Sequence, residues 1–156
     1  MLCPCGTQIS FESCCQKFLL GKAISQTAEQ LMRSRYSAFY VSNLDYIQKT
    51  MKEPASNQFD VQDTMRWLKK IKWIGLRVLK TENLTGSPSF VEFSAQYIEN
   101  DCLKTIHERS EFHLYDNHWF YIKGDHIEEP IIPLSQNKPC PCGNLKKYKN
   151  CHGQKG

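Results

Sequence analysis

Seven cysteines and one histidine occur in two copies of a single spacing, one copy near each end of the chain. The first copy consists of Cys3, Cys5, Cys14 and Cys15. The second copy consists of Cys140, Cys142, Cys151 and His152. In each copy a Cys-Pro-Cys-Gly run comes first, and eight residues separate the second ligand from the third. Four thiolate or imidazole groups are what a tetrahedral structural zinc ion requires, so the sequence predicts two zinc sites.

The residues between the paired thiols favour a fixed loop. The intervening proline restricts φ and lacks an N–H group. The glycine that follows permits a positive φ, which lets backbone amides point toward the thiolates. A segment this short buries too little apolar area to fold alone, so metal binding is expected to supply its folding free energy.

Disulfide bonds are the alternative explanation for an even number of cysteines. Cys3 lies so close to the first residue that no secretory leader fits before it, which favours a reducing, cytoplasmic setting. His152 also stands where the first copy has Cys15, and imidazole can replace thiolate at zinc but not in a disulfide. We therefore expect zinc. The eighth cysteine, Cys102, has no partner motif and is expected to be a half-buried apolar residue.

The composition indicates one domain with a strongly basic end. At 156 residues the chain accommodates a domain of about 110 residues and two small modules. No apolar run approaches the roughly 18 residues of a membrane helix. The formal net charge is +4, and residues 137–156 contain five lysines and no acidic residue. This segment is expected either to contact an anionic partner (protein, RNA or lipid headgroup) or to be a solvated tail.

The helical part of the sequence comes first. Apolar residues recur at three- and four-residue steps after Thr27, which with Gln30 forms a capping box, and predict a helix over 27–42. A short helix is expected to follow and to end before Pro54. A third helix, capped by Asp60, is expected to extend to Ile71.

The period then changes to two, which predicts strands. The expected strands are Ile74–Lys80, Phe90–Glu99, Leu103–Tyr115 and His118–Lys123, with a tight turn at residues 116–117. Helices followed by an antiparallel meander predict an α+β fold in which a curved sheet packs on helices.

Several segments together resemble the YchJ-like family of bacterial proteins. They are the first cysteine motif, the run from Leu31 to Phe39, the segments 73–76 and 107–112, and the strand at 119–121. Both terminal motifs resemble the SEC-C zinc motif, named from the C-terminus of the SecA ATPase. SEC-C motifs usually have Ser-Gly after Cys-Pro-Cys-Gly, whereas this chain has Thr7-Gln8 and Asn144-Leu145. Because leucine disfavours a positive φ, the second loop is expected to differ slightly.

The resemblance implies an NTF2-like cone, a bent sheet that wraps a long helix, between two zinc-binding modules. The expected division is an N-terminal module at 1–22, the NTF2-like domain at 23–134 and a C-terminal module at 135–156. The family has no assigned activity to transfer. We expect the first module to fasten the N-terminus to the cone and the second to face a partner.

NTF2-like cones commonly contain a pocket between the sheet and the helices. The candidate polar residues for this pocket are Arg33, Arg35, Tyr36, His107, Glu108, Arg109 and Tyr121. An ion pair of Glu108 with Arg33 or Arg35 would explain this set without catalysis, and we prefer that interpretation. The alternative is proton transfer by His107, which would need an acid nearby. His113, His118 and His126 are expected to be ordinary strand or loop residues.

Three functions follow from these features. The first, which we favour, is a non-enzymatic cytoplasmic adaptor that docks on a protein through its zinc modules. The second is an NTF2-like enzyme or small-molecule binder with a pocket near His107 and Glu108. The third is RNA or ribosome binding through the basic end of the chain. The candidate partner contacts are Lys146, Lys147, Tyr148 and Lys149.

Overall fold

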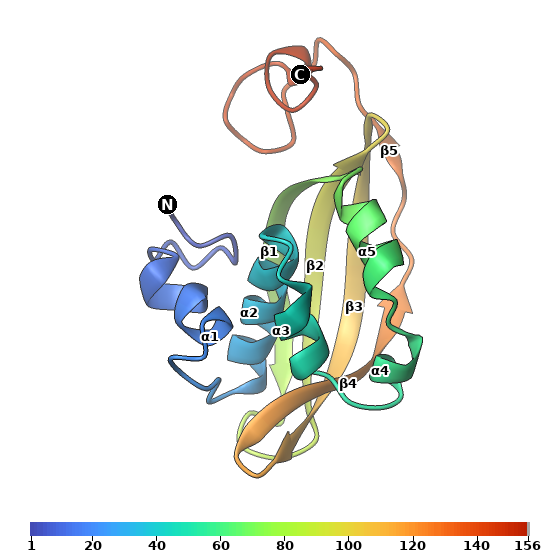
Figure 1. Cartoon of the computed structure of the whole chain (residues 1–156). Coiled ribbons are helices and arrows are strands. Elements are labelled where there is room, and N and C mark those ends of the chain that lie inside the picture. The colour runs from blue at the N-terminus through green and yellow to red at the C-terminus, as the bar shows by residue number, and fades with distance from the viewer. Residues whose placement is uncertain (156) are drawn as a thin grey trace.

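A curved antiparallel sheet with helices packed on its concave side confirms the predicted α+β architecture (Figure 1). The computed structural model describes residues 1–155. The helical elements are a π-helical turn Glu12–Gln16, α1 (Lys17–Leu19), α2 (Ala28–Tyr40), α3 (Leu44–Lys49), α4 (Ala55–Gln58), α5 (Val61–Leu68) and a 3-10 turn Tyr148–Asn150. The strands are β1 (Lys72–Glu82), β2 (Ser89–Glu99), β3 (Cys102–Tyr115), β4 (His118–Ile127) and β5 (Ile132–Pro133).

Side-chain caps fix where three of these helices begin. The Thr27 hydroxyl accepts a hydrogen bond from the backbone N–H of Gln30 at 3.1 Å, as the predicted cap requires. Asn43 and Asp60 cap α3 and α5 in the same way. The third helix ends at Leu68, three residues earlier than predicted, because β1 begins at Lys72. The single turn of α4 was not predicted, because it has no buried residue that could produce a periodic pattern.

The strands pair in the order β1-β2-β3-β4, and β5 adds to the first residues of β3. Two-residue turns join β2 to β3 and β3 to β4, and all four turn residues have positive φ, from 48° to 64°. Turns of this kind match the twist of the strands that they join. The four turn residues are Asn100, Asp101, Asp116 and Asn117. The predicted tight turn at 116–117 is therefore confirmed.

Bulges bend the sheet around α2. The pairing register shifts in β1 between Trp73 and Gly75 and again after Val78, and in β4, where Ile122 is the extra residue opposite Glu111 and Phe112. Each bulge increases the local twist and bends its strand. Figure 1 shows β4 crossing below the helices, so the sheet partly encloses them.

The main core lies between α2 and the sheet, and the N-terminal module belongs to it. Cys3, Cys5 and Cys15 are buried in one cluster with Leu31 of α2 and Phe112 of β3. The C-terminal module instead lies beyond one end of the sheet (Figure 1). The division of the chain at residues 22 and 134 stays a prediction. No helix within residues 1–155 is long and apolar enough to cross a membrane.

Candidate metal centres and cavity

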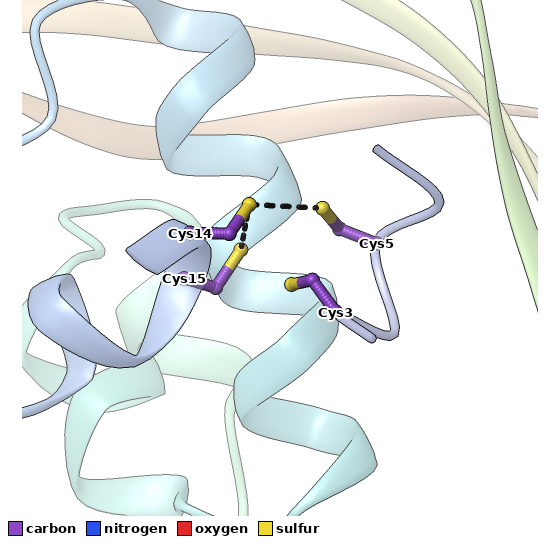
Figure 2. A group of neighbouring side chains, drawn as sticks. All are labelled: Cys3, Cys5, Cys14 and Cys15. Carbon is purple, nitrogen blue, oxygen red and sulfur yellow. Dashed lines mark hydrogen bonds between the residues drawn. The ribbon is translucent and has the colours of Figure 1, made fainter. Parts of the chain in front are cut away.

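Each copy of the repeated motif brings its four ligand residues together. The first group is Cys3, Cys5, Cys14 and Cys15, and the second is Cys140, Cys142, Cys151 and His152. In each group the four ligand atoms lie within 4.8 Å of one another. Figure 2 shows the first group, in which two thiols come from the N-terminal loop and two from the helical turn that follows it. The groups contain all the residues that the sequence predicted as metal ligands.

The distances within each group fit a tetrahedral metal site and exclude disulfides. Sulfur atoms bound to zinc at about 2.3 Å in a tetrahedron lie about 3.8 Å apart. The Sγ atoms of Cys5 and Cys14 are 3.6 Å apart, and those of Cys14 and Cys15 are 3.9 Å apart. In the second group, the Nδ1 atom of His152 is 3.2 Å from Cys140 Sγ. A disulfide requires about 2.05 Å, and all eight cysteines are free thiols.

The two modules share one loop geometry in detail. The backbone N–H of Cys3 donates to the carbonyl of Ile9 at 2.8 Å, and the N–H of Cys140 donates to that of Lys146 at 2.9 Å. In each loop the glycine after the second thiol has a positive φ, 87° for Gly6 and 81° in the second copy. The spacing therefore encodes a repeated backbone structure as well as a repeated ligand set.

The second loop does not differ in the way that the sequence suggested. Leu145 adopts a φ of 68°, and the residue at the same place in the first copy, Gln8, has a φ of 65°. Left-handed backbone at a leucine costs about 1–2 kcal/mol. Hydrogen bonds from the loop offset this cost: the Asn144 side chain accepts from the Lys146 N–H at 3.0 Å and donates to Cys151 Sγ at 2.9 Å.

The surroundings of the thiols favour a thiolate in each group. A hydrogen bond from Cys15 lowers the pKa of Cys5 to about 4. At Cys140, burial opposes ionisation, but hydrogen bonds from the backbone N–H groups of Cys142 and His152 outweigh it and lower the pKa to about 6. Metal ligation requires thiolates, so both groups are suited to bind a soft divalent cation.

The modules differ in how they attach to the cone. The N-terminal module lies against α2, where Arg33 donates to the carbonyl of Cys5 at 2.6 Å and pairs with Glu29. The C-terminal module makes a smaller contact through Tyr148, which is only 1% exposed and donates from its hydroxyl to Asp101 at 2.6 Å. The prediction that Tyr148 faces a partner is therefore wrong, because its ring is the buried anchor of the module.

A separate cavity lies between the helices and the inner face of the sheet, with a volume of about 250 Å³. Four of the predicted pocket residues line it: Arg35, Tyr36, Glu108 and Tyr121. His126, predicted to be an ordinary strand or loop residue, also lines the cavity because it pairs with Glu108 across β3 and β4. Most of the remaining wall is aromatic or aliphatic.

The expected ion pair of Glu108 with an arginine does not form within residues 1–155. Arg35 instead donates to the carbonyl of Ile47 at 2.8 Å and to the hydroxyl of Thr50 at 2.7 Å. Arg33 points to the N-terminal module, as described above. Glu108 accepts a hydrogen bond from the Tyr121 hydroxyl at 2.6 Å. Tyr121 therefore connects the Glu108 carboxylate to Arg35, since the Arg35 guanidinium stacks on the Tyr121 ring at 4.8 Å.

His107 and Arg109 lie on the outer face of β3, away from the cavity. The ring of His107 bridges Glu92 at 3.1 Å and Glu129 at 2.8 Å, and Arg109 pairs with Glu82. The prediction that they are pocket residues is wrong. Successive side chains of a strand point to opposite faces, so Glu108 points toward the cavity and its two neighbours point away from it. His107 thus joins β2 to the segment after β4.

We predict that this bridge makes stability depend on pH. The hydrogen bond of His107 with Glu92, and to a smaller extent the one with Glu129, raises the pKa of His107 above its ordinary value of 6.5. Its stabilising effect is therefore complete below about pH 6.5 and is lost as the pH rises through the higher folded pKa. Thermal unfolding of wild type and His107→Gln should differ most in the acid range and converge at alkaline pH. A difference that stays constant across this range would contradict the assignment.

The comparisons with known proteins agree with this structure. Residues 27–124 match the family model described as YchJ, middle NTF2-like domain. The chain belongs to the YchJ-like family. A UPF0225 protein of Photorhabdus laumondii is 40% identical over 156 residues, which cover 97% of this chain and 98% of that protein. A UPF0225 protein of Geobacter sulfurreducens is 38% identical over 159 residues, with the same two coverages.

Two solved structures are similar to this member of the YchJ-like family. One is the solution structure of a SEC-C motif containing protein from Rhodopseudomonas palustris, with a TM-score of 0.74 and 30% identity over 82% of this chain and all of that chain. The other is the crystal structure of a SEC-C motif containing protein from Psychrobacter arcticus. Its TM-score is 0.69 at 29% identity, over 98% of this chain and 96% of that chain. These matches support SEC-C modules at the two cysteine groups.

Proposed function

We propose that this protein is a non-enzymatic cytoplasmic adaptor that holds two structural zinc ions and docks on an acidic surface of another protein through its C-terminal module. Zinc is the metal that suits sets of four thiolate and imidazole ligands with no open position. The protein would fill all four ligand positions of each ion and leave none open for a substrate. The ions would therefore stabilise the modules and take no part in a reaction.

The observation that carries the proposal is the difference between the two modules. The N-terminal group shares the main core, whereas the C-terminal module lies beyond the end of the sheet (Figure 1), and most of its described residues are exposed. Lys146, Lys147 and Lys149 are exposed there, and Leu145 between the ligands is 95% exposed. An exposed apolar side chain that is followed in the sequence by exposed lysines suits a protein surface with a small pocket and acidic rim.

The same observation favours a protein over RNA as the partner. Binding to single-stranded RNA commonly combines positive charge with exposed aromatic rings on which bases stack. The one aromatic residue of this module, Tyr148, is buried. Its lysines remain suited to charge complementarity, and the resemblance to SEC-C motifs implies protein docking.

The test is affinity capture from a bacterial lysate, followed by binding of the captured candidate in purified form. Wild type is compared with a Lys146→Glu/Lys147→Glu variant and with a control, Lys22→Glu/Lys123→Glu, that makes the same charge change at exposed positions elsewhere. The expected result is a purified acidic protein that binds wild type and the control but binds the first variant at least about tenfold more weakly.

Nuclease treatment separates the alternatives. Binding that nuclease abolishes, with affinity for purified RNA that falls steeply with salt, would replace protein docking with RNA binding. Equal binding by the two charge variants would also contradict the proposal, because the C-terminal module would then not be the contact. Metal analysis of the same preparations should give two zinc ions per chain.

A further inference from the structure

The cavity of the cone contains a buried carboxylate that the protein satisfies only in part. Glu108 is 7% exposed and lines the cavity. Its Oε1 atom accepts the hydrogen bond from Tyr121, but no group within residues 1–155 donates to its Oε2 atom. This Oε2 atom is accessible, since Ser25 Oγ is the only side-chain polar atom of the described residues that is both buried and without a partner. It is therefore an acceptor that a ligand in the cavity can reach.

The neighbouring strand makes room for this carboxylate. Gly124 of β4 lies beside it, and a Cβ atom at this position would overlap both Oε1 and the carboxyl carbon of Glu108. Any other residue at position 124 would therefore displace the carboxylate. The Glu108 carboxylate thus fits in this position only because residue 124 of β4 has no side chain.

The groups around Glu108 are held in fixed positions. Both backbone groups of Tyr121 are hydrogen-bonded. Its N–H donates to the carbonyl of Thr50 at 2.9 Å, and its carbonyl accepts from the N–H of Lys52 at 3.0 Å. Thr50 also accepts from Arg35. The polar part of the cavity is thus organised before any ligand binds, which lowers the entropic cost of binding.

The two charges of the cavity wall balance each other. Burial lowers the pKa of Arg35 to about 10, so its guanidinium still carries a positive charge at neutral pH. Within residues 1–155 no direct ion pair joins Arg35 to Glu108, yet both line the same cavity. A cationic ligand would be repelled by Arg35 and an anionic one by Glu108. A neutral molecule that donates to Glu108 meets neither penalty.

The size and the walls of the cavity favour a flat aromatic molecule. Aromatic rings from two helices and four strands line it, including those of Tyr36, Trp67, Trp73, Phe93 and Phe112. The rings of Trp67 and Trp73 meet edge to face at 5.6 Å, and both also contact the ring of Tyr97, so a flat aromatic ligand would join an existing aromatic cluster. Since a cavity of about 150 Å³ takes benzene, a volume of 250 Å³ suits a ligand of roughly ten non-hydrogen atoms.

We propose that the cone binds a neutral, flat heteroaromatic molecule whose N–H group donates to Oε2 of Glu108. The aromatic walls would supply most of the affinity, and the hydrogen bond would supply the specificity. This inference is independent of the docking function, because none of the metal ligands or exposed lysines of the C-terminal module lines the cavity.

The test compares indole with benzofuran, which has nearly the same shape but an oxygen atom in place of the N–H group. Binding to the metal-loaded full chain is followed by nitrogen-15 NMR titration. We expect indole to shift resonances of the cavity residues and to bind at least about tenfold more tightly than benzofuran, the difference that a hydrogen bond to a charged acceptor produces. Glu108→Met should reduce this ratio to about one.

Glu111→Met is the matched control, because Glu111 lies on the same strand but pairs with His113 outside the cavity. It should keep the wild-type preference for indole. Equal binding of indole and benzofuran by wild type would overturn the proposal even if Glu108→Met did not fold. Absence of binding by both, or tighter binding of benzylammonium than of indole, would overturn it as well.

Discussion

Replacing Cys5 by serine should destabilise the whole protein, whereas replacing Cys142 by serine should affect only the C-terminal module. The two cysteines occupy the same position of the repeated motif, so each substitution removes the second ligand of one group. Cys5 is fully buried in the main core, against α2 and the sheet. Loss of its metal would therefore open one side of that core. We expect a cost of about 4 kcal/mol or more.

Cys142, by contrast, is only half-buried and lies with the small cluster around Tyr148. For a chain of this size, about 4 kcal/mol corresponds to a decrease in Tm of roughly 8–16 °C for Cys5→Ser. The Cys142→Ser variant should lose one metal ion but keep the Tm of the core within about 3 °C. Metal analysis and calorimetry of both variants provide the measurement. Equal shifts in Tm would contradict the asymmetry between the modules.

The metal groups could be predicted from sequence because their geometry is local. All four ligands of each group lie within 13 residues, from Cys3 to Cys15 and from Cys140 to His152, so spacing alone constrains the loop. The helix after Thr27 and the turn at 116–117 were predicted for the same reason, since caps and turns depend on neighbouring residues. Short elements such as α4 and β5 bury too little to leave a pattern.

The cavity could be predicted only in part because its composition depends on contacts distant in sequence. Alternation along β3 puts Glu108 and His107 on opposite faces, but the sequence does not show which face lines the cavity. His126 enters the site through its pairing with Glu108, a register that the bulge at Ile122 of β4 helps to set. The direction of Arg33 depends on the N-terminal module, which covers the side of α2 where this residue lies.

The misassignment of Tyr148 has a physical basis in the repeat. The first copy has Phe11 at the corresponding position, and its ring packs against the main core. In both copies an aromatic residue six positions after the second thiol attaches the module to the domain. The lysines beside Tyr148 made the segment look entirely surface-exposed, although the ring itself is buried against Ile98 and Leu103.

Tyr148→Ala should therefore detach the C-terminal module while leaving its metal site intact. Removing a buried aromatic ring costs about 3–5 kcal/mol, and this ring accounts for much of the contact between the module and the sheet. Tyr148→Phe keeps the packing but removes the hydrogen bond to Asp101, which should cost about 1.5–3 kcal/mol because the acceptor is charged. The alanine variant should thus have the larger effect.

Hydrogen exchange measured by mass spectrometry separates detachment from metal loss. In Tyr148→Ala, amides of residues 138–154 that bond within the module or to the linker should exchange faster, while those of β2 and β3 keep their protection. The metal content should stay at two ions per chain, since no ligand has changed. Tyr40→Ala, at a tyrosine that is 46% exposed, is the matched control and should leave exchange in the module unchanged. Wild-type protection in Tyr148→Ala would show that other contacts, such as that of Lys72 with the carbonyl of His152, suffice to anchor the module.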